Sequence, residues 1–358
     1  MRLGLYRLLA VVGLLTGCDS ADIAKPDSTG SSPSISSQSS ATETNTSLQG
    51  TVRIDGSSTV YPISEAASSA FCEKFTKVDV TVGVKGTGGG FSEFSKGSID
   101  ISDASRPIKQ NELAECVKNG IRFFELPIAY DGLAICVHKD NDFLDEISIE
   151  DLKTIYSADT APKSWKDVNA SFPDQPMKVF MPGTDSGTYD FFKEVVIGKE
   201  GNVRSDLTPS EQDLALVNGI ASEKYAIGFF GASYYFESTD KLKALKVIDP
   251  KTKQAIAPSA ETIENSTYSP LGRPLFIYVN AASVKRPELR KFVEYYIDHA
   301  SDICRSAKCV PLTDALYQTV RQRFDDRVEG TYFYDEAGNS RIGSLSEIYI
   351  ESNLTQAK

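Results

Sequence analysis

The residues with the clearest chemical potential lie in a short polar turn, Pro182-Gly183-Thr184-Asp185-Ser186-Gly187-Thr188. An apolar run ends at Met181, and residues 189–197 carry large apolar side chains at helical spacing, which predicts a strand, a turn and a helix. The first N–H groups of a helix have no partner within it and lie at the positive end of its dipole, so a turn of small residues leaves them accessible to an anion. Taken alone, the stretch also fits an ordinary helix cap.

Two earlier stretches repeat this arrangement. Residues 55–62 (DGSSTVYP) follow an apolar run and precede a helical pattern over residues 63–75. Residues 85–90 (KGTGGG) follow the apolar run 78–84, and we expect a short helix behind them over residues 91–96. Consecutive glycines at such a turn indicate that something approaches the backbone closely, as at oxyanion sites. None of the three turns carries a complete nucleotide-binding motif, so together they predict a site for a bare tetrahedral oxyanion.

The elements that must position these turns alternate along the chain. Strands are predicted, with helix-like segments between them, at residues 51–54, 78–84, 133–137, 179–181 and 275–279. This alternation predicts a mixed α/β fold. The roughly 300 residues after the N-terminal region exceed the usual size of one hydrophobic core, which indicates two domains.

The N-terminal region has the pattern of an export signal. Arg2 and Arg7 flank the beginning of a short apolar run at residues 8–15, and Leu15-Thr16-Gly17-Cys18 resembles a bacterial lipobox. The resemblance implies a signal peptide at residues 1–17 and a lipidated Cys18, with the mature chain in the periplasm and anchored to a membrane. A plain signal peptide with an incidental cysteine is the alternative. Residues 18–49 are polar and almost free of large apolar side chains, so we expect a disordered tether.

Composition and cysteine spacing exclude several classes of site. The net charge is −11 and no basic stripe is present, which argues against nucleic acid. The chain lacks a CxxC pair, and His138 is distant in sequence from the other histidine, so we expect no metal. Cys304 and Cys309 flank a short loop and are predicted to form a disulfide. Cys72 and Cys116 form a possible second bridge, and Cys136 is expected to be a buried thiol.

Seven motifs, in this order, resemble those of PstS-type phosphate-binding proteins, in particular the cyanobacterial branch often called SphX. They are DGSSTVYP (55–62), GTGGGF (86–91), DISDASRPI (100–108), ELPIAYDGL (125–133), PGTDSGTYDFF (182–192), AIGFFG (226–231) and RPLFIYVN (273–280). The resemblance covers residues 50–325. It implies a type II periplasmic-binding-protein fold of two α/β lobes joined by hinge strands. Lobe 1 would comprise residues 50–131 and 277–350, and lobe 2 residues 132–276.

The resemblance also implies a function and a set of phosphate ligands. The protein would capture inorganic phosphate between its lobes and deliver it to the permease subunits of an ABC importer, as a monomer without a cofactor. The positions that match the family's phosphate contacts are Ser58, Thr59, Val60, Thr87, Ser186, Gly187 and Thr188. Well-known enterobacterial members have an Asp where this chain has Arg106, and an Arg where it has Pro182, so their charged contacts do not transfer.

The charged ligands of the phosphate must therefore be predicted from the residues of this chain. We predict that Arg106 is the main cationic ligand, since Pro107 holds the preceding backbone extended and directs the side chain from a strand end. The alternative is an arginine paired with Asp100 or Asp103. Asp185 is the preferred acceptor for the proton that phosphate carries and sulfate lacks, with Asp213 as the second candidate.

Three other functions remain compatible with the residues. A phosphatase could use the hydroxyl groups of these turns, but neither His138 nor His299 lies near a motif to act as a base, so we do not expect an enzyme. The same fold could bind another oxyanion, such as sulfate or molybdate. It could also serve signalling or adhesion without transport.

Overall fold

The computed structural model describes residues 48–356, except residues 185, 199, 211, 336 and 342. The described residues all belong to one compact unit. The predicted signal peptide, the lipidation site at Cys18 and the predicted tether up to residue 47 lie outside the described residues. No helix in the described part of the chain is long and apolar enough to cross a membrane.

Five strands form the sheet of what we call lobe 1. β1 (Gly50–Gly56) lies between β2 (Val78–Val82) and β3 (Ile101–Ala104), and both pairings are parallel. β12 (Gly272–Asn280) runs antiparallel between β3 and β4 (Phe123–His138). The other elements of lobe 1 are α1 (Tyr61–Lys74), α2 (Gly86–Phe94), α3 (Gln110–Lys118), η2 (Ser283–Lys285), α10 (Pro287–Asp298), α11 (Ala300–Ser306), β13 (Val310–Pro311), α12 (Asp314–Asp325), α13 (Leu345–Ile348) and η3 (Glu351–Asn353).

What we call lobe 2 is built on the second half of β4. From Leu133 onward β4 pairs antiparallel with β8 (Ala226–Gly231), and β8 pairs parallel with β6 (Lys178–Pro182). The other elements of lobe 2 are β5 (Glu146–Ser148), α4 (Ile149–Tyr156), α5 (Trp165–Val168), α6 (Gly187–Phe192), the π-helical turn η1 (Lys193–Ile197), β7 (Thr208–Ser210), α7 (Asp213–Ala221), α8 (Ala232–Phe236), β9 (Leu242–Ala244), β10 (Lys246–Ile248), β11 (Ala255–Ile256) and α9 (Ala260–Glu264). The mixed α/β prediction is confirmed.

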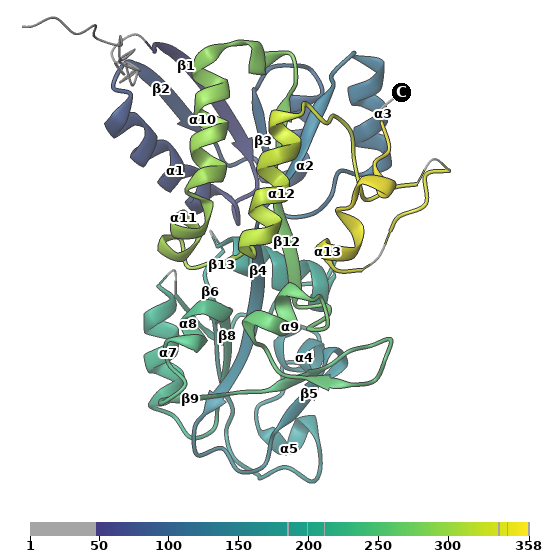
Figure 1. The fold of residues 1–358 in the computed structure, drawn as a ribbon. Helices are drawn as coiled ribbons and strands as arrows, with labels where there is room; N and C mark the ends of the chain where they lie inside the picture. The colour runs from purple at the N-terminus through teal and green to yellow at the C-terminus, as the bar shows by residue number, and fades with distance from the viewer. Residues whose placement is uncertain are drawn as a thin grey trace, which may run out of the picture. The chain divides into compact units, whose positions relative to one another are not determined.

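Two strands connect the lobes. β4 is a single sixteen-residue strand that belongs to both sheets, and Figure 1 shows it running from one group of helices into the other. β12 pairs with β4 from Gly272, opposite Gly132, but with β3 only from Phe276 onward. A pair of antiparallel strands thus joins the lobes, and both strands pass from one lobe to the other near residues 132 and 272.

The glycine-rich stretch differs from the sequence-based expectation. α2 begins at Gly86 rather than at Phe91, so the three consecutive glycines lie inside the helix. A Cβ at Gly90 would lie 2.7 Å from both the Gly56 Cα and the Ser102 Oγ. Gly90 therefore has a packing role, because it lets α2 pack closely against β1 and β3. The close approach that the sequence predicted for the glycines is, at Gly90, an approach of the protein's own strands rather than of an anion.

The predicted disulfides are corrected by the structure. Cys304, Cys309, Cys72 and Cys116 are all free thiols, as is the buried Cys136. The Cys304 sulfur is directed at the Ile128 carbonyl (3.4 Å) and the Tyr317 hydroxyl (3.6 Å). The Cys309 sulfur lies 3.8 Å from the Ala307 carbonyl. Each sulfur of the predicted 304–309 pair is thus directed at a hydrogen-bonding partner of its own.

Candidate functional site

A cavity of about 410 Å³ lies where loops of lobe 1 meet β12 and the first helical turns after β6. Four of the predicted ligands line it: Ser58, Thr59, Thr87 and Arg106. The other lining residues are Ser57, Gly86, Gly88, Ser105, Lys109, Asp190, Phe191, Lys193, Glu194 and Arg273. The wall combines hydroxyl groups, glycine backbone and four basic side chains with two carboxylates.

The first wall is the start of α1. Ser57 N donates to the Asp103 carbonyl (3.0 Å) and thereby ties the turn after β1 to the end of β3. Thr59 N donates to Ser57 Oγ (3.2 Å). Val60 is the N-cap residue and no described side chain caps α1. Its first N–H groups are nevertheless taken, because Tyr61 N donates to the Ser57 carbonyl (3.0 Å), Ile63 N donates to the Val60 carbonyl (2.9 Å), and Pro62 has no N–H. The open helix end that the sequence predicted is therefore not found at α1. The Val60 side chain is fully buried, so only its backbone is suited to contact an anion.

The second wall is the start of α2. The Thr87 and Ser105 hydroxyl groups lie 3.1 Å apart, and Ser105 N donates to Thr87 Oγ1 (3.2 Å). These bonds hold the glycine-rich turn against the loop that follows β3. α2 is a second helix that no described side chain caps. Hydroxyl groups and an uncapped helix end are donors suited to an oxyanion.

Arg106 lies in the cavity wall, but its guanidinium is already engaged. Nη1 and Nη2 donate to the two carboxylate oxygens of Glu112 (2.9 and 2.8 Å), and Nη1 also donates to the Pro107 carbonyl (3.1 Å). The alternative pairing with Asp100 or Asp103 is therefore wrong, and Glu112 is the partner. Because Glu112 occupies the two-pronged face, a ligand in the cavity meets only the remaining N–H groups of Arg106.

Arg273 was missed by the sequence analysis. It begins the RPLFIYVN motif on β12, where its Cα pairs with that of Asp131 on β4. Nε donates to Asp131 Oδ2 (3.3 Å), Nη2 donates to Thr59 Oγ1 (3.1 Å), and the guanidinium carbon lies 3.6 Å from the Phe191 ring centre. The side chain is only 14% exposed. Burial lowers the pKa of Arg273 and raises that of Asp131, and their mutual attraction opposes both shifts.

The turn from lobe 2 contacts lobe 1 at the edge of the cavity. Thr59 Oγ1 lies 3.4 Å from the Gly187 carbonyl, and a Cβ at Gly187 would lie 2.6 Å from Thr59 N. Ser186 caps α6 by accepting from Thr188 N (3.2 Å). None of these three lobe 2 residues is among the residues that line the cavity. Asp185 lies outside the described residues.

Among the described residues, the carboxylates at the cavity do not include Asp213, the second predicted candidate. Asp213 begins α7 and is not among the described residues that line the cavity. Asp190 and Glu194 line it instead, and Asp190 Oδ2 accepts from Ser58 Oγ (3.3 Å). Asp190 was visible in the sequence, but it stands inside an apolar helical pattern and no turn signal marks it.

The arrangement suits the binding of an anion. Neither histidine lines the cavity. Within residues 48–356, apart from the five that are not described, no group of three or more His, Cys, Asp or Glu side chains could hold a metal ion. The cavity supplies N–H and O–H donors from several elements around one small volume.

Comparison with known proteins decides the family. Residues 41–299 match the family model described as a PBP superfamily domain. The chain belongs to the PBP superfamily. It is 46% identical over 298 residues to the protein SphX of Synechococcus elongatus, which covers 83% of this chain and 87% of SphX. It is 36% identical over 276 residues to the phosphate-binding protein PstS of Staphylococcus aureus, which covers 77% of this chain and 82% of PstS.

A solved structure agrees in fold. The crystal structure of a possible phosphate-binding protein from Planctomyces limnophilus is 40% identical and superposes with a TM-score of 0.76. The match covers 78% of this chain and 99% of that protein. The predicted resemblance to PstS-type proteins and the predicted two-lobed fold are both confirmed.

Proposed function

We propose that this protein is an extracytoplasmic solute-binding protein that captures inorganic phosphate in the cavity and delivers it to an ABC importer. The observation that carries the proposal is the convergence on one small cavity of the start of α2, which no described side chain caps, the hydroxyl groups of Ser58, Thr59 and Thr87, and two arginines. Each hydrogen bond to a charged group is worth about 1.5–3 kcal/mol, so a few of these donors suffice for tight binding. The PstS relative supports phosphate as the anion.

The lobes would close on the ligand about the paired strands. We propose lobe boundaries near residues 131 and 276, because β4 leaves the lobe 1 sheet and β12 enters it close to those positions. The Thr59–Gly187 and Ser58–Asp190 contacts between the lobes support a closed arrangement. A Cβ at residue 187 would hold the lobes apart, so the glycine supports close approach.

We also propose the cellular setting. The lipobox-like residues 15–18 support a lipid anchor at Cys18, and residues 18–49 support a tether that lets the binding unit reach a permease. The chain would act as a monomer and would not be an enzyme; the PstS relative is a phosphate-binding protein, and neither His138 nor His299 lines the cavity.

Calorimetric titration tests the function. We expect one phosphate to bind each protein molecule, with sulfate and molybdate at least a thousandfold weaker, because a carboxylate such as Asp190 can accept the proton of phosphate but repels an unprotonated anion. Binding of sulfate with equal affinity would favour a different oxyanion. Turnover of p-nitrophenyl phosphate would favour the phosphatase.

A further inference from the structure

The chain after α12 returns along lobe 1. We call residues 330–356 the C-terminal segment, and positions 336 and 342 within it are not described. Gly330 N donates to the Phe123 carbonyl (3.0 Å) at the start of β4, and Thr331 exchanges two backbone hydrogen bonds with Thr355 (2.9 and 2.8 Å). The Phe333 ring lies 5.2 Å from that of Phe276 on β12. The segment, yellow in Figure 1, is therefore fastened to the two strands that connect the lobes.

A buried carboxyl group on β4 holds the segment. Glu125 is 2% exposed and accepts hydrogen bonds from Thr331 Oγ1 (2.7 Å), Tyr332 N (2.8 Å) and the Tyr278 hydroxyl (2.8 Å). Its backbone carbonyl accepts from the Tyr349 hydroxyl (2.9 Å). Burial raises the pKa of Glu125 to about 7, and the three hydrogen bonds oppose that shift. All three donors favour the ionised carboxylate.

Tyr278 continues the chain of contacts towards the cavity. Its hydroxyl, which donates to Glu125, also accepts from Ile108 N (2.9 Å), two residues after Arg106. Its ring packs edge-on against Phe91 of α2 at 4.8 Å, and Phe91 lies 5.6 Å from the Arg106 guanidinium. Tyr278 thus contacts both the loop that carries Arg106 and the helix that begins with the glycine-rich turn.

A second route joins the segment to Arg106 through α3. The Gln110 side chain donates to the Gly338 carbonyl in the C-terminal segment. Glu112, one half-turn further along α3, accepts hydrogen bonds from both Nη atoms of Arg106. Both routes end at the same guanidinium, which lies in the cavity wall.

We propose that the C-terminal segment supports the ligand site from outside the cavity, and that Tyr278 and Glu125 are positioning residues that fix the Arg106 loop for the anion. The proposal rests on the proposed phosphate-binding function. Removal of one of the buried hydrogen bonds that join Thr331, Glu125, Tyr278 and Ile108 lets the Arg106 loop move. Phosphate binding must then restore the position of the loop, which lowers the affinity.

Two tyrosine variants separate positioning from mere stability. Tyr278→Phe removes the hydroxyl that joins Glu125 to Ile108 N, whereas Tyr349→Phe removes a buried hydroxyl on the same Glu125 that makes no contact with the Arg106 loop. We expect the two variants to lower the melting temperature similarly. By calorimetry, Tyr278→Phe should weaken phosphate binding by about three- to tenfold, the value of one neutral hydrogen bond, and Tyr349→Phe by less than twofold.

A double variant tests whether the effect passes through Arg106. In an Arg106→Ala background, Tyr278→Phe should weaken phosphate binding by less than twofold, because the group that it positions is absent. Thr331→Val tests the segment itself, because it removes the hydroxyl that donates to Glu125 and keeps the shape of the side chain. We expect a two- to fivefold loss of phosphate affinity that also disappears in the Arg106→Ala background. Thr331→Val therefore decides the question if Tyr278→Phe does not fold.

Three outcomes would overturn the proposal. They are parent-like phosphate affinity in both Tyr278→Phe and Thr331→Val, equal losses in the two tyrosine variants, or losses that stay the same without Arg106. A parent protein that binds no phosphate would instead overturn the proposed function, and the inference with it.

Discussion

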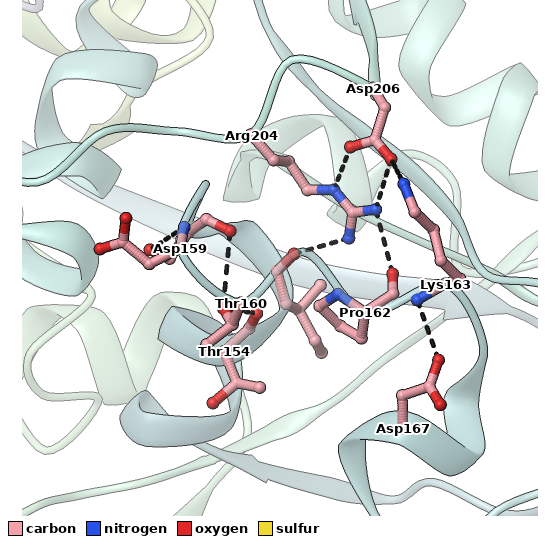
Figure 2. A network of polar contacts seen from close by, with 10 residues as sticks. Thr154, Asp159, Thr160, Pro162, Lys163, Asp167, Arg204 and Asp206 are labelled. Atoms are coloured by element: carbon pink, nitrogen blue, oxygen red, sulfur yellow. Dashed lines mark hydrogen bonds and ion pairs between the residues drawn. The ribbon is translucent and has the colours of Figure 1, made fainter.

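Arg204 in lobe 2 and Arg273 at the cavity show two opposite uses of one side chain. Arg204 is 4% exposed and makes four hydrogen bonds, two to Asp206 and one each to the Ile155 and Pro162 carbonyls (Figure 2). Arg273 makes two among the described residues, to Asp131 and to Thr59. A guanidinium has five N–H donors. Protein acceptors therefore satisfy Arg204 almost completely, whereas Arg273 retains donors for a ligand.

The surroundings of the two side chains sharpen the contrast. Arg204 joins loops of lobe 2, and Lys163 Nζ lies 2.5 Å from Asp206 Oδ2. Hydrogen bonds from Arg204 and Lys163 together hold the pKa of Asp206 well below its ordinary value. Arg273 lies on a connecting strand and contacts Thr59 of lobe 1 and Phe191 of lobe 2. An arginine that fastens loops supports stability, while one that borders a cavity between lobes supports binding.

The largest expected effect is that of Arg273→Ala on phosphate affinity. Loss of two charge-assisted hydrogen bonds, at about 1.5–3 kcal/mol each, predicts a hundredfold or greater rise in the phosphate Kd. Arg122→Ala is the matched control, since Arg122 is a mostly exposed arginine paired with Glu329 away from the cavity. The comparison fails if folded Arg273→Ala binds phosphate as tightly as Arg122→Ala does, in parallel calorimetric titrations.

Arg204→Ala should show the reverse behaviour. Its removal leaves two buried carbonyl groups without a donor, so we expect the free energy of unfolding to fall by about 2–4 kcal/mol in urea titrations. Phosphate affinity should remain within twofold of the parent, measured where the variant is folded. A tenfold loss of affinity in folded Arg204→Ala would show that the two arginines do not have separate roles.

Arg106→Ala should have a smaller effect on binding than Arg273→Ala. Because Glu112 and the Pro107 carbonyl take three of its five N–H groups, Arg106 retains two donors for a ligand, one fewer than Arg273. We expect about a tenfold rise in the phosphate Kd, and Arg106→Lys should recover part of it. A greater loss than in Arg273→Ala would indicate that Arg106 leaves Glu112 when phosphate binds.

The smallest expected effect concerns Asp103, a buried carboxyl group that has no cationic partner among the described residues. Burial raises the pKa of Asp103 to about 8, whereas Arg273 opposes the corresponding shift at Asp131. A raised pKa favours the folded state while the group is protonated, and this contribution is lost as pH rises through 8. The free energy of unfolding should fall between pH 6 and 9, by at most about 1.4 kcal/mol per pH unit for this proton.

Asp103→Asn should flatten that part of the profile. Glu125, with a pKa of about 7, remains in the variant and accounts for the slope below pH 7.5. Chemical unfolding at several pH values measures both profiles. Identical slopes for parent and variant above pH 7.5 would mean that Asp103 does not titrate there.

Local patterns predicted the turns but not the whole site. Ser58 and Thr59 lie between a strand and a helix, and Thr87 lies in the first turn of α2, so their types and positions are visible within a few residues. Arg273 reaches the cavity only because β12 pairs with β4 and places it opposite Asp131, more than 140 residues earlier in the chain. Short-range patterns do not encode such pairings.

Arg106 illustrates an intermediate case. Its place at a strand end was predictable, but its partner was not, although Glu112 is only six residues away. Glu112 faces Arg106 because it accepts from Lys109 N (2.8 Å) at the start of α3, which fixes the direction of its side chain. A capping contact thus decided which acidic residue pairs with Arg106.

The central claim is that phosphate binds in this cavity against Arg273 and the neighbouring hydroxyl groups, and a crystal structure of the protein with phosphate tests it most directly. We predict a phosphate whose oxygens lie within hydrogen-bond distance of the Arg273 guanidinium and of hydroxyl groups from Ser58, Thr59 or Thr87. A phosphate bound elsewhere, or one held in the cavity without any contact to Arg273, would contradict the account.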